Sequence, residues 1–181
     1  MMTFTYHGGT TVHIGNGKRD ITVFAEKGTK PGDREIVFFS SPEEEPTEGT
    51  ISWPGEYDIE GMAIQGIGHD EGGRISWALQ IDGVRCAFIS SPLHDWTDFE
   101  LELLGDVDVL VIPCDDPKIL QKMVDEVDPR VLIPLDTGGA EKFEESLRIC
   151  GAQGKEPVDS FELKGSLPSE GREVVVLKAK K

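Results

Sequence analysis

Basic residues are scarce in this chain. Its 181 residues include 18 Lys and Arg against 34 Asp and Glu, which gives a formal net charge of −16. A field of this sign repels phosphate backbones and anionic lipid headgroups. No local basic patch interrupts it, so we expect binding to neither nucleic acid nor a membrane surface.

Long apolar runs and paired cysteines are also missing. The most apolar segment, residues 107–113, is interrupted by Asp108 and is far shorter than the ~20 residues that cross a bilayer. The three cysteines, Cys86, Cys114 and Cys150, form no Cys-x-x-Cys pair, which predicts reduced thiols in the core and no cysteine-based zinc site. The first residues, MMTFTYHGG, have neither the basic start nor the apolar stretch of a secretion signal, and we expect a cytoplasmic protein.

The first half of the chain has the punctuation of a β-rich region. Gly, Pro and Asp divide it into short apolar runs, and Asp82-Gly83 is a favoured hairpin turn. The length of the chain suits one domain, residues 1–181. The expected strands are residues 10–14, 21–25, 36–39, 49–53, 62–66, 75–81 and 84–89.

After residue 90 the apolar residues recur at helical spacing. Helices are expected near residues 99–104, from Asp116-Pro117 to residue 127, and over residues 139–150. Near-continuous apolar strands at 107–113 and 131–135 flank the second helix, which predicts a crossover between two parallel strands. Strands are again expected at 160–163 and 173–178.

Two segments, residues 41–60 and 95–116, are strongly acidic. Such runs are usually solvated faces. Binding of a cation or of a basic partner remains the alternative.

Several motifs occur in an order that resembles a known family. They are WPGEYDIEG at 53–61, GHDEGG at 68–73, IDGVR at 81–85, LGDVDVLVIP at 104–113 and DPRVLIP at 128–134. Together they resemble the metallo-β-lactamase superfamily, most closely its compact branch of predicted zinc-dependent hydrolases related to L-ascorbate-6-phosphate lactonase. The resemblance implies an α+β fold, a four-layer αβ/βα sandwich with two sheets packed face to face.

The metal-binding motifs of that superfamily are altered in this chain. The resemblance places Ser41, Glu43, Glu45 and Pro46 where the family has its His-x-His-x-Asp-His ligands. Ser91 stands at the position of the middle Asp ligand and Asp136 at that of the late His ligand. Because zinc needs at least three good donors, we expect no standard dinuclear zinc centre and no cofactor.

Three carboxylates, Glu43, Glu45 and Asp136, nevertheless remain in that region. If the loops follow the family geometry, these oxygens would suit a hard cation such as Mg or Ca. The alternative is that the loop at 43–45 points into water.

His69 and His94 stand at family-like positions outside the ligand set. Together with Ser91, a histidine base would offer a metal-free route to hydrolysis, provided that base and nucleophile lie within hydrogen-bond distance. The alternative is that His94 packs or caps near the start of a helix.

We therefore predict a metallo-β-lactamase-fold protein with a degenerate metal site, a pseudoenzyme that acts as a binding or interaction module. The expected partner is an unidentified protein or small molecule, and a homo-oligomer remains open. The alternative is a hydrolase of a small ester, lactone or phosphoester-like substrate, which would use a non-standard carboxylate and histidine site.

Overall fold

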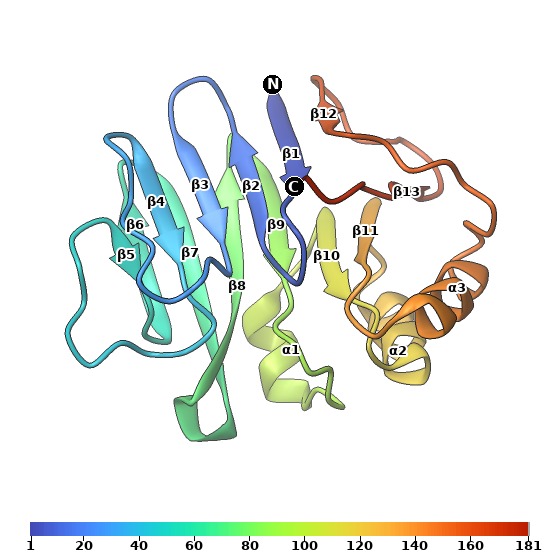
Figure 1. Ribbon diagram of the computed structural model, residues 1–181, viewed down its shortest axis with the longest axis horizontal. Helices are drawn as coiled ribbons and strands as arrows, with labels where there is room; N and C mark the ends of the chain where they lie inside the picture. The colour runs from blue at the N-terminus through green and yellow to red at the C-terminus, as the bar shows by residue number, and fades with distance from the viewer. Residues whose placement is uncertain (181) are drawn as a thin grey trace.

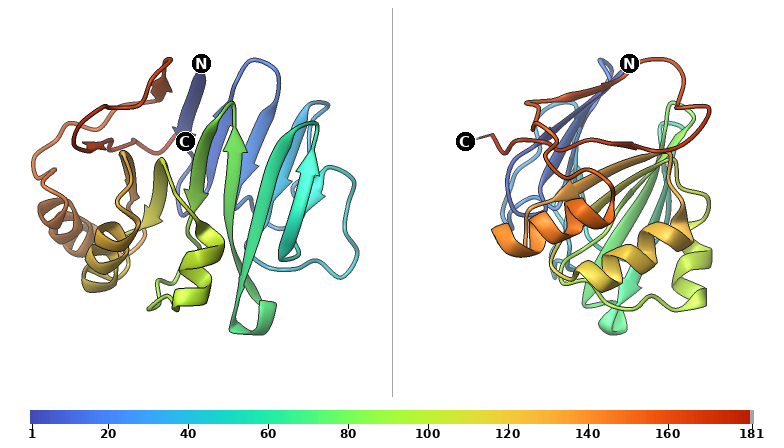
Figure 2. Two further views of the ribbon diagram at one scale, coloured as in Figure 1. Left: turned by 180° about the vertical axis from the view of Figure 1, so that it is seen from behind. Right: turned by 90° about the vertical axis from the view of Figure 1, so that its right-hand side faces the viewer.

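A computed structural model describes residues 1–180, and in it two β-sheets pack face to face (Figure 1). The side view in Figure 2 shows the two sheets as separate layers, with the helices at one end of the sandwich. None of the helices described in these residues is long and apolar enough to span a membrane.

The first sheet has six strands in the order β12-β1-β2-β3-β4-β5. The pairs β3–β4 and β4–β5 are parallel, and the other pairs are antiparallel. Its strands are β1 (Met2–Tyr6), β2 (Val12–Gly15), β3 (Asp20–Val23), β4 (Glu35–Phe38), β5 (Thr50–Ile51) and β12 (Phe161–Leu163).

The second sheet has seven strands in the order β13-β11-β10-β9-β8-β7-β6. One half is an antiparallel meander from β6 to β9, and the other half, from β9 to β13, is parallel. Its strands are β6 (Gly55–Ile59), β7 (Met62–His69), β8 (Arg74–Ile81), β9 (Val84–Phe88), β10 (Val109–Pro113), β11 (Val131–Leu135) and β13 (Glu173–Val174).

Three α-helices follow the meander: α1 (Asp98–Leu104), α2 (Pro117–Val127) and α3 (Ala140–Ile149). Local chemistry defines where they begin. The Thr97 hydroxyl caps α1 and Glu100 reaches back to complete a capping box. Asp116 caps α2 just before Pro117.

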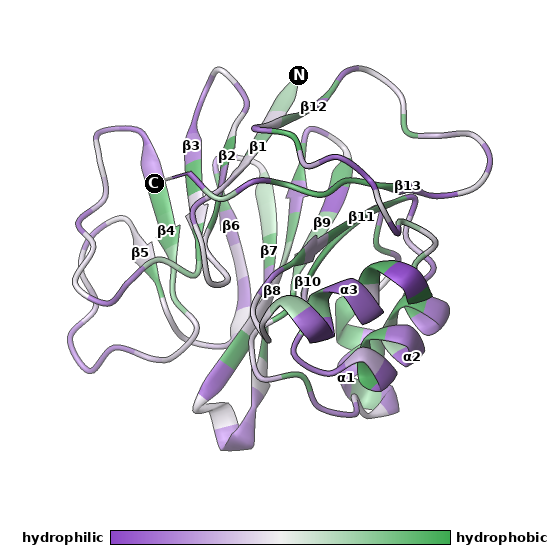
Figure 3. Ribbon diagram, turned by 45° about the vertical axis from the view of Figure 1, so that its right-hand side comes forward, coloured by the Kyte–Doolittle hydropathy of each residue, from purple (hydrophilic) through white to green (hydrophobic). Residues whose placement is uncertain are grey.

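Alternation along the strands produces two apolar layers. In β8, Ile75, Trp77 and Leu79 point into the core between the sheets. Ala78, on the other face, joins a second core that the helices cover. Figure 3 shows helices that are hydrophobic towards the sheet and hydrophilic outside.

The six-stranded sheet has a different outer face. Thr5, His13 and Thr22 lie side by side across β1, β2 and β3 on the face opposite the core. The buried hydrophobic side chains of all three helices belong to the core against the seven-stranded sheet. Among residues 1–180 no helix therefore covers this polar face.

The α+β metallo-β-lactamase sandwich expected from the sequence is confirmed, although in residues 1–180 the helices cover one sheet and not both, as a four-layer arrangement would require. The parallel crossover β10-α2-β11 is also present. Strands β1 and β6 had not been expected, and the strand expected at 173–178 is regular only at Glu173–Val174. After that, Leu177 makes an isolated parallel bridge with Val158, and Ala179 makes one with Tyr6.

Candidate functional site

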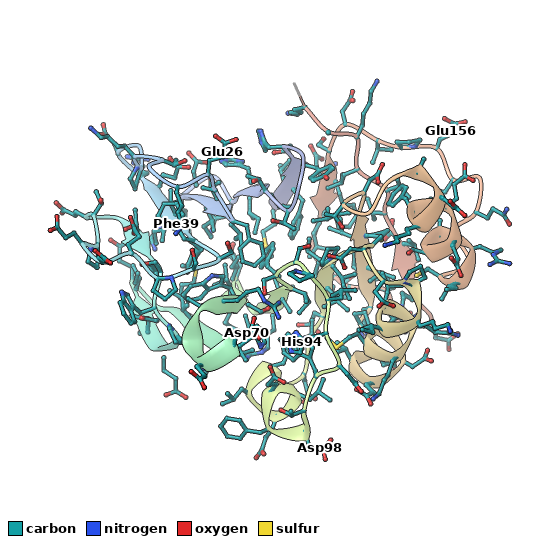
Figure 4. The ribbon with its side chains drawn as sticks, turned by 60° about the horizontal axis from the view of Figure 1, so that its bottom comes forward. Glu26, Phe39, Asp70, His94, Asp98 and Glu156 are labelled. Atoms are coloured by element: carbon teal, nitrogen blue, oxygen red, sulfur yellow. The ribbon has the colours of Figure 1, made fainter. Side chains whose placement is uncertain are left out.

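Polar side chains gather under α1, on the outer face of the seven-stranded sheet. His69 is the last residue of β7, and Arg74 is paired with it across the β7–β8 hairpin. Ser76 follows two residues later and so points to the same face as Arg74. Figure 4 shows His94 at this end of the molecule, near Asp70 of the hairpin and Asp98 at the start of α1.

Glu100 is at the centre of this group because the capping box fixes it in the first turn of α1. Its Oε2 contacts Nδ1 of His69 and lies 3.0 Å from Nε2 of His94. Its other oxygen accepts a hydrogen bond from the Thr97 backbone N–H at 2.9 Å. The carboxylate is thus held by three donors, one at the end of β7 and two in the loop before α1.

The far side of each imidazole also has a partner. Nε2 of His69 lies 2.9 Å from the Ser76 hydroxyl, which in turn lies 3.1 Å from the Ser90 hydroxyl. Arg74 donates to that Ser90 hydroxyl at 3.0 Å and to Nδ1 of His94 at 2.9 Å. The six side chains form a closed ring of hydrogen bonds: Arg74, His94, Glu100, His69, Ser76 and Ser90.

Burial and hydrogen bonds together set the charges in this ring. It lowers the pKa of His69 to about 4, although the hydrogen bond to Glu100 opposes the shift. Burial also raises the pKa of Glu100, but hydrogen bonds from Thr97, His94 and His69 outweigh it and hold that pKa at about 2. At neutral pH Glu100 is therefore ionised and His69 is neutral, and the Arg74 guanidinium supplies the balancing positive charge.

Trp96 forms one wall of the group. Its ring centroid lies 4.7 Å from that of His69, and the ring stacks on His94 at 5.8 Å. Its Nε1–H is buried and has no acceptor within the described chain. Because buried donors normally have a partner, this indole N–H can take an oxygen atom of a bound ligand or water.

His69, His94 and Glu100 have the donor types and spacing of a metal site. Their ligand atoms lie within 4.8 Å of one another. Two imidazole nitrogens and a carboxylate oxygen are ligands that zinc accepts, and the Ser76 hydroxyl beside His69 is a suitable outer partner. The expectation of no cofactor conflicts with this group.

The three carboxylates singled out in the sequence do not form such a group within residues 1–180. Glu43 accepts a hydrogen bond from the Thr50 hydroxyl at 2.9 Å, whereas Glu45 and Asp136 are exposed. A Mg or Ca ion held by these three carboxylates therefore stays a prediction without a converged set of ligands.

The structure separates Ser91 from the histidines as well. Its hydroxyl donates to the Asp115 carboxylate, while the ring nitrogens of His94 contact Arg74 and Glu100. Ser91 and His94 are therefore not arranged as nucleophile and base. His69 and His94, on the other hand, lie together, with ring centroids 4.6 Å apart.

Sequence reasoning missed Glu100 and Arg74. The pattern Thr97-x-x-Glu100 is a capping-box signal, and it would have placed Glu100 at the start of a helix six residues after His94. Arg74 has a weaker signal, since only the hairpin register places it opposite His69.

Comparisons with known proteins agree with this fold. A family model described as "Beta-lactamase superfamily domain" matches residues 38–136, more than half of the chain. No curated protein is significantly similar in sequence.

Solved structures are similar over nearly the whole chain. A putative Zn-dependent hydrolase of the metallo-β-lactamase superfamily from Thermotoga maritima has a TM-score of 0.76 and 21% identity, over 99% of this chain and 100% of its own. Igni18, a metallo hydrolase from Ignicoccus hospitalis, has a TM-score of 0.61 and 13% identity, over 90% and 99%. The metallo-β-lactamase fold protein YhfI from Bacillus subtilis has a TM-score of 0.62 and 10% identity, over 98% and 97%. At these identities the similarity concerns the fold.

Proposed function

Since this chain belongs to the β-lactamase superfamily domain family, we propose that it is a hydrolase-like protein whose cation-binding centre is His69, His94 and Glu100. The observation that carries the proposal is the convergence of these three ligand atoms within 4.8 Å. The centre replaces the loop at 41–46, which contains no histidine.

The residues of the group have separate roles in binding a cation. Glu100 supplies the negative charge that attracts a cation, and the capping box with Thr97 keeps its carboxylate in place. The Ser76 hydroxyl orients the His69 ring from its far nitrogen. When bound, a divalent cation would supply a Lewis acid that polarises a carbonyl or phosphoryl oxygen of a substrate.

The substrate class follows from that chemistry. Small esters, lactones and phosphoester-like compounds all have an oxygen that a Lewis acid polarises. The net charge of −16 disfavours polyanionic substrates such as nucleic acids.

Metal retention tests the proposal directly. Untagged protein is loaded with zinc, manganese or magnesium, freed of excess ion by gel filtration and measured by plasma mass spectrometry. We expect about one zinc or manganese ion per chain, with loss of that ion in Glu100→Gln and His69→Ala. His13→Ala is the matched control, because His13 lies on the outer face of the other sheet.

The proposal fails if the loaded ion is retained equally by Glu100→Gln and His69→Ala, because the ion would then lie elsewhere. Protein that retains an ion at the cluster is next tested on aryl esters, lactones and phosphodiesters. Turnover is expected only with added metal and only with His69 present.

A binding or interaction module is the second candidate, and the closed ring favours it. Each member of the ring has a partner within the chain, and Arg74 already places a positive charge against His94, whose other nitrogen bonds Glu100. A ring of this kind can serve to fix the hairpin and α1 as a surface for an unidentified protein, a small molecule or a second copy. No metal retention under every loading condition, with full folding, would favour this candidate.

A further inference from the structure

Arg74 occupies a position that matters for any cation at this centre. Its Nη2 lies 2.9 Å from Nδ1 of His94. Its Nη1 donates to the Ser90 hydroxyl at 3.0 Å and to the Pro92 carbonyl at 2.9 Å, and Nε lies 3.2 Å from Asp70. The bonds to Ser90 and Pro92, in the loop that carries His94, therefore hold the guanidinium against the His94 ring.

A guanidinium has hydrogen-bond donors and no acceptor. Nδ1 of His94, facing Nη2 of Arg74, must therefore be the unprotonated nitrogen. The proton of the neutral ring is then on Nε2, which donates to Glu100 at 3.0 Å.

Metal binding by His94 requires the opposite arrangement. The nitrogen that faces His69 and Glu100 is Nε2, and a metal ligand must offer a lone pair there. The proton of the neutral ring then moves to Nδ1, where it would meet the N–H of Arg74. Coordination by Nε2 and the Arg74 contact are thus mutually exclusive.

His69 has no such obstacle. The partner of its far nitrogen is the Ser76 hydroxyl, 2.9 Å away, and a hydroxyl both donates and accepts. Rotation of that hydroxyl allows either tautomer of His69. The restriction therefore falls on His94 alone, and it comes from Arg74.

We infer that the Arg74 guanidinium and a divalent cation compete for this centre. While Arg74 contacts His94 the cation is excluded, and a bound cation displaces Arg74 from His94. The inference rests on the proposed function. When Arg74 leaves His94, its guanidinium can stay paired with Asp70, which its Nε already contacts. The Asp70 side chain is 72% exposed, so the displaced guanidinium would lie at the surface.

The test compares zinc and manganese affinities of the wild type and Arg74→Gln by competition with a chromogenic chelator. We expect Arg74→Gln to bind at least tenfold more tightly. Arg85→Gln is the matched control, because it removes the same charge from the neighbouring strand, where Arg85 bonds carbonyl groups of α1, and its affinity should stay within about twofold of the wild type.

Equal affinity of Arg74→Gln and the wild type overturns the inference and leaves the proposed function intact. An equal gain in Arg85→Gln also overturns it, because the net charge would then be the cause. Binding by neither the wild type nor Arg74→Gln overturns the proposed function itself. Circular dichroism and a thermal melt establish that each variant is folded.

A second measurement needs no variant. The ¹⁵N shifts of the His94 ring report which nitrogen carries the proton. We expect Nε2–H without metal and Nδ1–H after addition of zinc to the wild type. Nδ1–H in the metal-free protein would overturn the inference even if Arg74→Gln failed to fold.

Discussion

The Ser91 hydroxyl donates its hydrogen to the Asp115 carboxylate, and this bond ties the segment after β9 to the segment after β10. The second oxygen of Asp115 accepts the Leu93 backbone N–H at 3.2 Å. The sequence resemblance had placed Ser91 at the position of a metal ligand, whereas in the structure one carboxylate and two donors, the Ser91 hydroxyl and the Leu93 N–H, join the two strand ends.

Replacing Asp115 by Ala should therefore loosen this junction. Two hydrogen bonds to a charged group are lost, and we expect a loss of about 2 kcal/mol in the free energy of unfolding. Ser91→Ala should cost about 1 kcal/mol, and the double variant little more than Asp115→Ala alone. Urea unfolding measures all three. Strictly additive losses would contradict the idea that the two residues act through one bond.

Glu100→Gln tests the centre of the hydrogen-bond ring for its contribution to stability. Glu100 is mostly buried, with 13% of its side chain exposed, and an amide cannot accept from both histidines with the strength of a carboxylate. We expect a loss of about 2 kcal/mol, again by urea unfolding. Glu102→Gln, on the exposed side of the same helix, should change stability by less than about 0.5 kcal/mol. Equal effects of the two substitutions would refute a special role for Glu100.

Gly66 is predicted to tolerate no side chain. A Cβ atom built there would lie 2.7 Å from the Trp77 ring and 3.2 Å from Cα of Pro54. Trp77 is fully buried and its indole N–H is bonded to the Phe39 carbonyl at 2.9 Å, so the ring has no room to move. Gly66→Ala should destabilise the fold by about 2 kcal/mol.

Gly15→Ala is the control for Gly66→Ala, because its nearest neighbour would be Asp20 Oδ1 at 3.4 Å, an ordinary contact. Thermal melts of both variants give the comparison. A melting temperature of Gly66→Ala equal to that of Gly15→Ala would show that the Trp77 ring can move aside for the added methyl group.

Alkaline stability should depend on Tyr6. Burial, with Asp136 and Cys114 nearby, raises the pKa of Tyr6 to about 12 from its ordinary value of 10.0. The folded state thus keeps a proton that the unfolded chain releases, so this contribution is complete below pH 10 and is lost as the pH rises towards 12.

The expected size of this loss is of the order of 2 kcal/mol, since one pKa unit corresponds to about 1.4 kcal/mol. Urea midpoints measured across this pH range should fall in the wild type. The fall should be smaller in Tyr6→Phe, which has no phenol to ionise. Parallel profiles of the two proteins would exclude Tyr6 as the cause.

The sequence predictions that succeeded were based on patterns within short stretches of the chain. The crossover β10-α2-β11 was predictable because its two strands are near-continuous apolar runs, and because Asp116 and Pro117 mark where the helix begins. Strand β1 was missed although Met2–Tyr6 alternates apolar and polar residues and pairs with the nearby strand β2. Its other partner, β12, lies about 160 residues further along the chain, and no short-range pattern predicts that pairing.

The candidate site shows the same division. His69 and His94 were recognisable as residues of interest, but not as neighbours, because the hairpin β7–β8 and α1 bring them together only after folding. The carboxylates at Glu43, Glu45 and Asp136 were placed by likeness to the family loops. In the structure Glu45 and Asp136 are exposed and Glu43 is bonded to Thr50.

The polar outer face of the six-stranded sheet also determines which positions of these strands can vary during evolution. In β1, β2 and β3 only every second residue reaches the core, and the positions between, such as Thr3, His13 and Thr22, line the other face. Variation among natural relatives should therefore alternate along these strands, with apolar residues retained at Phe4 and Ile21 and a wide choice of β-forming residues between them. In β10 and β11, where both faces are buried, no such alternation is expected.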